Sequence, residues 1–389
     1  MKHLGDITKI SGYAAPMVDV VIGGSPCQDL SVAGKRAGLD GERSGLFMEQ
    51  VRIIKEMREK DASNGRSGID VRPRYTVWEN VYGAFSSNKG EDFRVVLEEL
   101  AKVADKNASI PRPTDGKWTS CGCIVADGYS IAWRVLDAQF WGVPQRRRRI
   151  ALVADFGGQS APEILFVRES VSGYSHESLT QRKGTAADAE GSIGADDCIG
   201  VDIYNTALTG DKVCPLTTGF TTTGTCPKVM TIYSVDQGGG KSSCNITEEQ
   251  APTLTCTHGG EPVVCYRHIV RRLTPLECER LQGYTDGWTD IGEWTDSNGK
   301  NRQTSDSARY KALGNSIALP AWKWVLKRLC ACYERDATMA SLFDGIGGFP
   351  YLWEQLNGKG SCPWASEIEE FPMAVTKVRI GDTYGKENT

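Results

Sequence analysis

Short apolar segments that end at glycine or polar loops and precede helical patterns are the feature that most constrains the fold of this chain. Residues 17–22 form such a segment and stop at Gly23-Gly24, as expected of a buried strand that meets a loop. Apolar residues then recur with helical period from Ser44, the expected N-cap, to about residue 60. This succession of strand, loop and helix is the building unit of α/β folds.

The same unit recurs along the chain. Strands are predicted over residues 75–78, 129–135 and 150–156, a loop over 79–90, and helices over 93–103, 275–281 and 317–333. Near the end of the chain, an apolar strand runs into a glycine-rich turn and a further helix over 349–356. We therefore expect a mostly parallel sheet that is covered by helices.

Residues 157–264 differ in composition from the segments on either side. They are rich in Thr, Gly and Ser, and their apolar runs are too short for a helix. The length of 389 residues suits two domains better than one. We predict that 157–264 form a smaller, loop-rich, β-leaning domain, and that 1–156 and 265–389 together build the larger one.

Charge and cysteine content limit the class of protein. The net charge is −4, so any nucleic-acid binding must depend on local basic patches such as Arg146–Arg149. Thirteen cysteines without a repeating spacing favour reduced thiols, and the single CxC pair, Cys121 and Cys123, has no second pair at zinc-ligand spacing. We expect no metal. The absence of a membrane-length apolar run and of a signal-peptide core predicts a cytoplasmic protein.

A glycine-rich turn near the end of the chain is a candidate nucleotide site. Phe343-Asp344-Gly345-Ile346-Gly347 follows an apolar strand, and Glu367 lies about twenty residues later, at the end of the next predicted strand. Glycines permit close approach of the backbone to a ligand, and a carboxylate at this spacing can bind ribose hydroxyls. Taken alone, the motif is as consistent with a structural turn as with an adenosine site.

Two reactive side chains follow predicted strands in the first part of the chain. Cys27 is predicted in a loop directly after the 17–22 strand. Pro26 fixes its own φ and so stiffens the backbone that precedes Cys27. Glu79 follows the 75–78 strand and is expected at the same sheet edge, where its carboxyl could act as a positioned acid or base. A structural cysteine and a surface glutamate are the alternatives.

These segments resemble the signatures of the cytosine carbon-5 methyltransferases. The resemblance rests on PCQ at 26–28, ENV at 79–81, QRRRR at 145–149, FDGIGGF at 343–349, GDI at 5–7, RRLTPLECERLQGY at 271–284 and GNS at 314–316. Together they cover most of the chain outside 157–264. The resemblance implies a Rossmann-like methyltransferase domain that uses S-adenosyl-L-methionine, with 157–264 as the target-recognition domain.

The order of the segments departs from the family pattern. The cofactor loop and the ribose acid usually come first, whereas here they lie within 338–378, after GNS. The chain is therefore expected to be a circular permutation, which an exposed cut site tolerates. The join over residues 334–338 must then be short.

The resemblance assigns roles residue by residue. Cys27 is implied as the nucleophile at carbon 6 of a flipped-out cytosine, Glu79 as the acid at ring nitrogen 3, and Arg147 and Arg149 as active-site arginines. If 146–149 form a strand, Arg147 and Arg149 point the same way. The implied cofactor contacts are Phe343, Asp344, Gly345, Gly347, Glu367, Ile368, Asp6, Ile7, Pro26 and Asn315, with Ile368 where the family often has tryptophan.

Double-stranded DNA is the partner implied by this resemblance, and a monomer is the starting hypothesis. An RNA cytosine methyltransferase is the first alternative, because a related branch with the same motifs acts on transfer RNA. A catalytically silent DNA-binding protein is the second, although Cys27 and Glu79 are both present. The target sequence and a cognate restriction endonuclease are left open.

Overall fold

The computed structural model describes residues 1–25, 45–166 and 273–381, and the backbone of short strands between residues 198 and 272. Ser44, the expected N-cap, lies outside the described residues. The chain divides into two compact units. Unit 1 contains 1–136, 148–171 and 322–389, and unit 2 contains 137–147 and 172–321.

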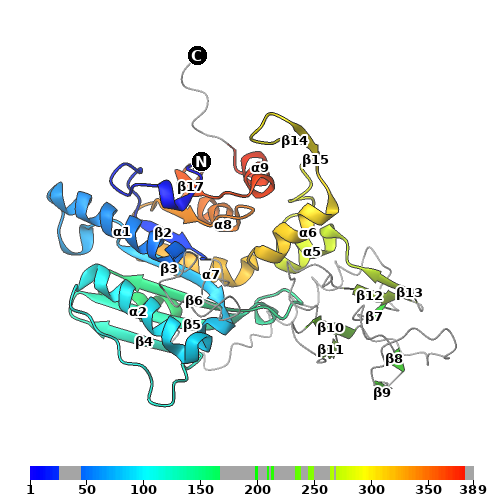
Figure 1. Ribbon diagram of the computed structural model, residues 1–389, viewed down its shortest axis with the longest axis horizontal. Helices are drawn as coiled ribbons and strands as arrows, with labels where there is room; N and C mark the ends of the chain where they lie inside the picture. The colour runs from blue at the N-terminus through cyan, green and yellow to red at the C-terminus, as the bar shows by residue number, and fades with distance from the viewer. Residues whose placement is uncertain are drawn as a thin grey trace. The chain divides into compact units, whose positions relative to one another are not determined.

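A mixed eight-stranded sheet forms the centre of unit 1 among the described residues (Figure 1). Its order is β1-β17-β16-β2-β3-β6-β5-β4. The strands are β1 (Lys2–His3), β2 (Val20–Gly23), β3 (Tyr75–Val81), β4 (Cys121–Ala126), β5 (Tyr129–Asp137), β6 (Arg148–Asp155), β16 (Met339–Leu342) and β17 (Trp364–Ser366). The five strands from β1 to β3 are parallel to one another, and β6 pairs antiparallel with β3. The α/β fold with a mostly parallel, Rossmann-like sheet is thus confirmed.

Helices of unit 1 follow the strands as the sequence predicts. They are α1 (Gly45–Ser63), α2 (Glu91–Ala104), α3 (Ala161–Leu165), α8 (Gly348–Asn357) and α9 (Glu370–Arg379), with most of α7 (Leu319–Cys330). Short 3-10 turns lie at η1 (Ile7–Lys9), η3 (Gly68–Asp70), η4 (Tyr82–Phe85) and η5 (Ser87–Gly90). None of the helices in the described part of the chain is both long and apolar enough to span a bilayer.

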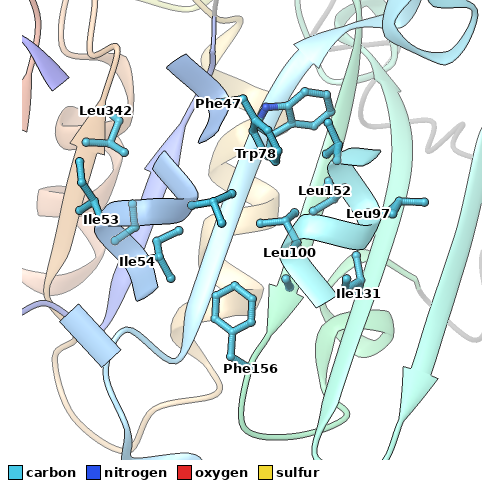
Figure 2. Close-up of a cluster of buried hydrophobic side chains, with 14 of the residues drawn as sticks. Phe47, Ile53, Ile54, Trp78, Leu97, Leu100, Ile131, Leu152, Phe156 and Leu342 are labelled. Atoms are coloured by element: carbon cyan, nitrogen blue, oxygen red, sulfur yellow. The ribbon is translucent and has the colours of Figure 1, made fainter. Parts of the chain in front are cut away.

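A large hydrophobic core lies between the sheet and the helices α1 and α2. Figure 2 shows Phe47 of α1 and Leu97 and Leu100 of α2 gathered over Trp78 and Leu152 of the sheet. These five side chains are at most 1% exposed. Burial of this apolar area is the main force that holds the helices against the strands.

The strand encoded near the end of the chain occupies a central place in the sheet. β16 lies between β17 and β2, and β1 extends the sheet beyond β17. The nitrogen of Met1 lies 3.1 Å from the carbonyl oxygen of Gly381, two residues after the end of α9. The first and last described segments therefore meet, as a permuted order requires.

The join between α7 and β16 is held by one buried carboxylate. Asp19 accepts hydrogen bonds from both terminal guanidinium nitrogens of Arg335, at 2.9 and 2.6 Å, and from the Thr338 amide at 2.8 Å. Burial alone would raise the pKa of Asp19, but these hydrogen bonds outweigh it and hold the pKa below its ordinary value. The join is thereby fixed to the residue that precedes β2.

Two expectations about element bounds need correction. β3 continues through Val81, so Glu79–Val81 end a strand rather than begin a loop. β6 begins at Arg148, so the arginine run is not a strand over its whole length. In both cases the antiparallel pairing of Glu79–Val81 with Arg149–Ala151 extends the strands. The sequence did not predict this extension, because the polar residues Glu79, Asn80 and Arg149 interrupt the apolar pattern of a strand.

Unit 2 contains η6 (Ala138–Phe140), α5 (Pro275–Gln282) and α6 (Asp306–Asn315). Its described strands are β7 (Cys198–Ile199), β8 (Leu208–Thr209), β9 (Lys212–Val213), β10 (Tyr233–Gln237), β11 (Cys244–Glu248), β12 (Val263–Tyr266), β13 (Ile269–Arg272), β14 (Glu293–Thr295) and β15 (Asn301–Gln303). They pair antiparallel as β10–β11, β12–β13, β12–β7, β14–β15 and β8–β9.

The division between the units differs from the expected boundary at residue 264. Residues 265–321 cluster with unit 2 rather than with the large sheet. Within this segment, buried Glu279 of α5 accepts hydrogen bonds from the amides of Gly287 and Thr289 and pairs with Arg309 of α6. A boundary chosen from composition does not detect such contacts.

Candidate active site

The predicted site residues of unit 1 gather at one edge of the sheet. Because β1, β17, β16, β2 and β3 are parallel, their carboxyl ends lie at the same edge. Each strand has one site residue at or just beyond its carboxyl end: Asp6 for β1, Glu367 for β17, Phe343 for β16, Gly24 for β2 and Glu79 for β3. Ligands of open α/β sheets bind at this edge.

The glycine-rich turn after β16 has the backbone geometry of a ligand cradle. Phe343, Gly345 and Gly347 all have positive φ, at 56°, 56° and 79°. A Cβ at Gly345 would meet no atom within 4 Å, so this part of the turn faces open space. A Cβ at Gly347 would come within 2.9 Å of Ile380, so glycine is required there for close packing against α9.

The Glu367 carboxylate is held beside this turn by backbone amides. Its Oε2 accepts a hydrogen bond from Gly345 at 2.7 Å, and its Oε1 accepts from Ile368 and Glu369 at 2.7 and 2.9 Å. Oε1 thus uses both of its lone pairs, whereas Oε2 retains a second lone pair for a hydroxyl donor. Ile368 is 69% exposed, so its apolar side chain is available to a ligand beside Glu367.

Asp344 lies beneath the turn. Its Oδ1 accepts a hydrogen bond from Ser341 at 2.6 Å, and Thr376 of α9 lies 3.5 Å from its Oδ2. Burial raises the pKa of Asp344 to about 8, the nearby Glu367 carboxylate adds to the rise, and the two hydroxyl groups oppose it. Asp344 therefore supports the turn largely as a neutral carboxyl at pH 7.

The segment after β1 contributes one exposed and one buried side chain. Asp6 caps η1 by accepting hydrogen bonds from the Thr8 amide and hydroxyl, which lower the pKa of Asp6. Ile7 is 3% exposed and belongs to the hydrophobic core. Asp6 is thus the more accessible of the two, and Ser366 fixes this segment to β17 by donating to Gly5 at 2.7 Å.

Glu79 forms an ion pair with Arg149. The Arg149 Nε lies 3.0 Å from the Glu79 Oε1, and both side chains are about 15% exposed. The β3–β6 register places Val81 opposite Arg149, so Glu79 and Arg149 share one face of the sheet. A Cβ on Gly24 would lie 2.8 Å from the Glu79 Oε2, so glycine leaves room for this carboxylate.

The backbone that leads to Cys27 is held by the other face of β3. Trp78 Nε1 donates to the Ser25 hydroxyl at 3.1 Å, and Asn80 Nδ2 donates to the Ser25 carbonyl oxygen at 3.1 Å. Pro26 and Cys27 lie outside the described residues. Sequence reasoning missed Trp78 and Asn80 as supports, although alternation along the strand around Glu79 could have identified them.

Arg147 and Asn315 belong to unit 2. Arg147 is 2% exposed, and its guanidinium donates to the carbonyl oxygens of Gly314, at 3.0 Å, and Ser316. Asn315 lies between these two residues, at the exposed end of α6. Arg147 therefore holds the backbone on both sides of Asn315, and it precedes the strand on which Arg149 lies.

The donor set at the sheet edge fits an adenosine-containing cofactor. A glycine turn that faces open space, a carboxylate oxygen with an unused lone pair and an exposed apolar side chain follow one another around the ends of β16 and β17. A ribose diol and an adenine ring require these groups. Among the described residues, no cluster of His, Cys, Asp or Glu is arranged to hold a metal ion.

Comparison with known proteins identifies the family. The sequence model of the C-5 cytosine-specific DNA methylases matches residues 1–104 and 124–331, which is more than half of the chain. The chain belongs to this family. The glycine turn at residues 343–347 lies after the matched range, in agreement with the altered segment order.

The individual relatives of this chain are distant. It is 28% identical to the "DNA N-6-adenine-methyltransferase" of Escherichia phage P1 over 86% of this chain and 56% of that protein. It is 27% identical to the "Type II methyltransferase M1.ScrFI" of Lactococcus lactis subsp. cremoris over 85% of this chain and 67% of that protein. The crystal structure of the S. pombe Dnmt2 methyltransferase aligns with a TM-score of 0.44 and 16% identity, over 83% of this chain and 82% of that chain. This chain thus spans little more than half of the phage protein.

Proposed function

We propose that this protein methylates carbon 5 of cytosine in duplex DNA through a covalent adduct between Cys27 and carbon 6 of a flipped-out base. The observation that carries the proposal is the juxtaposition at one sheet edge of the Glu79–Arg149 pair, Ser25, which is two residues before Cys27, and the glycine turn beside Glu367. Membership of the C-5 cytosine methylase family supports the same chemistry.

Glu79 acts on the base in this proposal. Its carboxyl lies beside Gly24, three residues before Cys27, and would share a proton with ring nitrogen 3 when the thiolate adds to carbon 6. Arg149 holds the carboxylate in place and compensates its charge while the site is closed to water. Once carbon 5 has taken the methyl group, a base, which we propose is water, removes the carbon 5 proton, and the electrons of that C–H bond expel the Cys27 thiolate from carbon 6.

The cofactor site in the proposal is the turn after β16. S-adenosyl-L-methionine would supply the methyl group from its sulfonium. Glu367 would bind the ribose hydroxyls, Ile368 and the segment at Asp6 and Ile7 would contact the adenine, and Phe343, Gly345 and Gly347 would line the cradle. Asp344 supports the cradle from below, and Pro26 and Asn315 are proposed at the methionine end.

Target recognition is assigned to residues 157–264, of which 172–264 belong to unit 2. These residues are rich in Thr and Gly and their described strands are short, which suits loops that read base edges in a DNA groove. Base flipping is required because the reacting carbons are inaccessible in a stacked duplex, and it costs about a few kcal/mol.

A trapping experiment tests the nucleophile and the acid. With duplex DNA that contains 5-fluorocytosine, the wild-type protein is expected to form a stable covalent complex, whereas Cys27→Ala should form none and still bind the cofactor. Glu79→Gln should slow methyl transfer by about 100-fold or more, the usual range for a lost acid–base group. Normal turnover by Cys27→Ala would refute the assigned nucleophile.

The substrate and product are tested separately. Labelled cofactor should transfer its methyl group to duplex DNA rather than to transfer RNA, and digestion to nucleosides should give 5-methylcytosine. Labelling of transfer RNA alone would establish the RNA alternative. N6-methyladenine as the product would place this chain with the activity named for the phage P1 relative and would overturn the cytosine assignment.

A further inference from the structure

Three consecutive arginines near the proposed site have different surroundings. Arg147 is buried and donates to backbone carbonyl oxygens, and Arg149 pairs with Glu79. Arg148 is exposed, and among the described residues no carboxylate lies within ion-pair distance of it. Its five N–H donors therefore face water, in a chain whose overall charge is negative.

The Arg148 guanidinium is nevertheless held in place. Its Cζ lies 4.1 Å from the ring centroid of Tyr82, a close cation–π contact. Tyr82 is 40% exposed and is supported from behind by Phe85, with ring centroids 5.5 Å apart. Phe85 in turn packs against buried Phe93 at 4.7 Å. The Tyr82 ring is thus a rigid platform that extends from the hydrophobic core.

This platform is next to the catalytic edge. Tyr82 directly follows β3, and Arg148 is the first residue of β6, which pairs with β3. Side chains alternate along the strands, so Glu79 and Arg149 lie on one face of the sheet. Arg148 lies on the other face together with Asn80, which donates a hydrogen bond to Ser25. Arg148 therefore lies on the face of the sheet from which Asn80 binds Ser25, two residues before Cys27.

We propose that Arg148, stacked on Tyr82, binds a backbone phosphate of duplex DNA next to the target base. This inference rests on the proposed function. Arg binds phosphate through two parallel hydrogen bonds, and a guanidinium already fixed on an aromatic ring loses little conformational entropy when it does so. The contact would position the DNA strand and would carry no base specificity.

The salt dependence of DNA binding tests the charge. Each phosphate contact contributes about 0.9 to the slope of log affinity against log salt concentration. Arg148→Ala should reduce this slope by about one and weaken binding roughly tenfold at 0.1 M salt. Lys359→Ala is the matched control, because Lys359 is exposed in the turn before β17, at the opposite edge of the sheet. The control should leave slope and affinity unchanged.

Two further variants separate the charge from the platform. Arg148→Lys keeps the charge but loses the planar fork, so the slope should be retained while affinity falls by a few fold. Tyr82→Leu keeps Arg148 but removes the aromatic face, with the same expected result. A loss of slope in Tyr82→Leu equal to that in Arg148→Ala would overturn the assigned division of roles.

The outcomes distinguish this inference from the proposed function. If the wild-type protein methylates cytosine in DNA and folded Arg148→Ala binds with the wild-type slope, the phosphate contact is refuted and the proposed function stands. If the wild-type protein binds and methylates RNA but not duplex DNA, both are refuted. Thermal unfolding of each variant shows that it is folded, and Arg148→Lys provides the measurement if Arg148→Ala does not fold.

Discussion

At the scale of single residues, the site depends on how closely Gly24 and Glu79 approach each other. Gly24 does not require an unusual backbone conformation, since its φ is not in the positive range. It is required because a side chain there would occupy the space of the Glu79 carboxylate. In the sequence, Gly24 looks only like the end of a strand, whereas in the structure it leaves the space that the Glu79 carboxylate occupies.

Gly24→Ala should displace Glu79 from Arg149 and lower the rate of methyl transfer at least tenfold, because a catalytic group misplaced by 1 Å loses much of its effect. Gly83→Ala is the control, since a Cβ there has no neighbour closer than 4.0 Å. Methylation rates of both variants under saturating DNA give the comparison. Equal rates would show that Glu79 adjusts freely or has no role.

Asp344 predicts a pH-dependent stability. Its folded pKa of about 8 lies above the ordinary value near 3.8, so the folded protein binds more protons than the unfolded chain between these values. Stability should therefore fall as pH rises from about 4 to 8. Asp344→Asn lacks this effect, and its stability relative to the wild type should increase over that range by at most about 1.4 kcal/mol per pH unit. Denaturant unfolding of the two proteins from pH 5 to 9 measures it, and parallel profiles would contradict it.

At the scale of elements, the join between α7 and β16 shows how a short connection is made stable. Asp19 precedes β2, and Arg335 and Thr338 lie in the join, so one carboxylate connects segments more than 300 positions apart. The Tyr333 hydroxyl adds a hydrogen bond to the Asp19 carbonyl oxygen at 3.2 Å. These contacts fix the start of β16, the strand that precedes the glycine turn.

Asp19→Asn should destabilise the protein by about 2–3 kcal/mol at pH 7, since it weakens hydrogen bonds to a charged acceptor. The lowered pKa of Asp19 means that its stabilisation is complete above the unfolded value near 3.8 and is lost as pH falls through the folded value. The difference from wild type should therefore shrink below about pH 4. Asp336→Asn, exposed in the same join, is the control and should be neutral in urea unfolding.

At the scale of the whole molecule, the order of segments matters less than their contacts. β16 pairs with strands from both ends of the chain, and the Met1 nitrogen lies against the Gly381 carbonyl oxygen. The sheet of unit 1 can therefore be encoded from more than one starting point.

A chain that begins at residue 334, runs to 381, continues through a linker of a few glycines into residue 1 and ends at 333 should fold and bind the cofactor. Its melting temperature should lie within a few degrees of the original, because short surface connections change stability little. The control is a chain with the same linker whose new ends lie between Ile54 and Lys55, inside α1, and this chain should not fold. Circular dichroism and thermal melts distinguish the two, and an unfolded product from the first design would contradict the prediction.

The sequence by itself determined the α/β class, the family and the motifs that carry Cys27, Glu79 and Glu367, because apolar periodicity and local motifs are encoded by neighbouring residues. It did not determine that Glu79 ends a paired strand, that Arg147 supports the backbone around Asn315, or that Arg148 stacks on Tyr82. Those relations join residues distant in the chain. Only the tertiary structure decides them, because they depend on register, packing and which charges are left facing water.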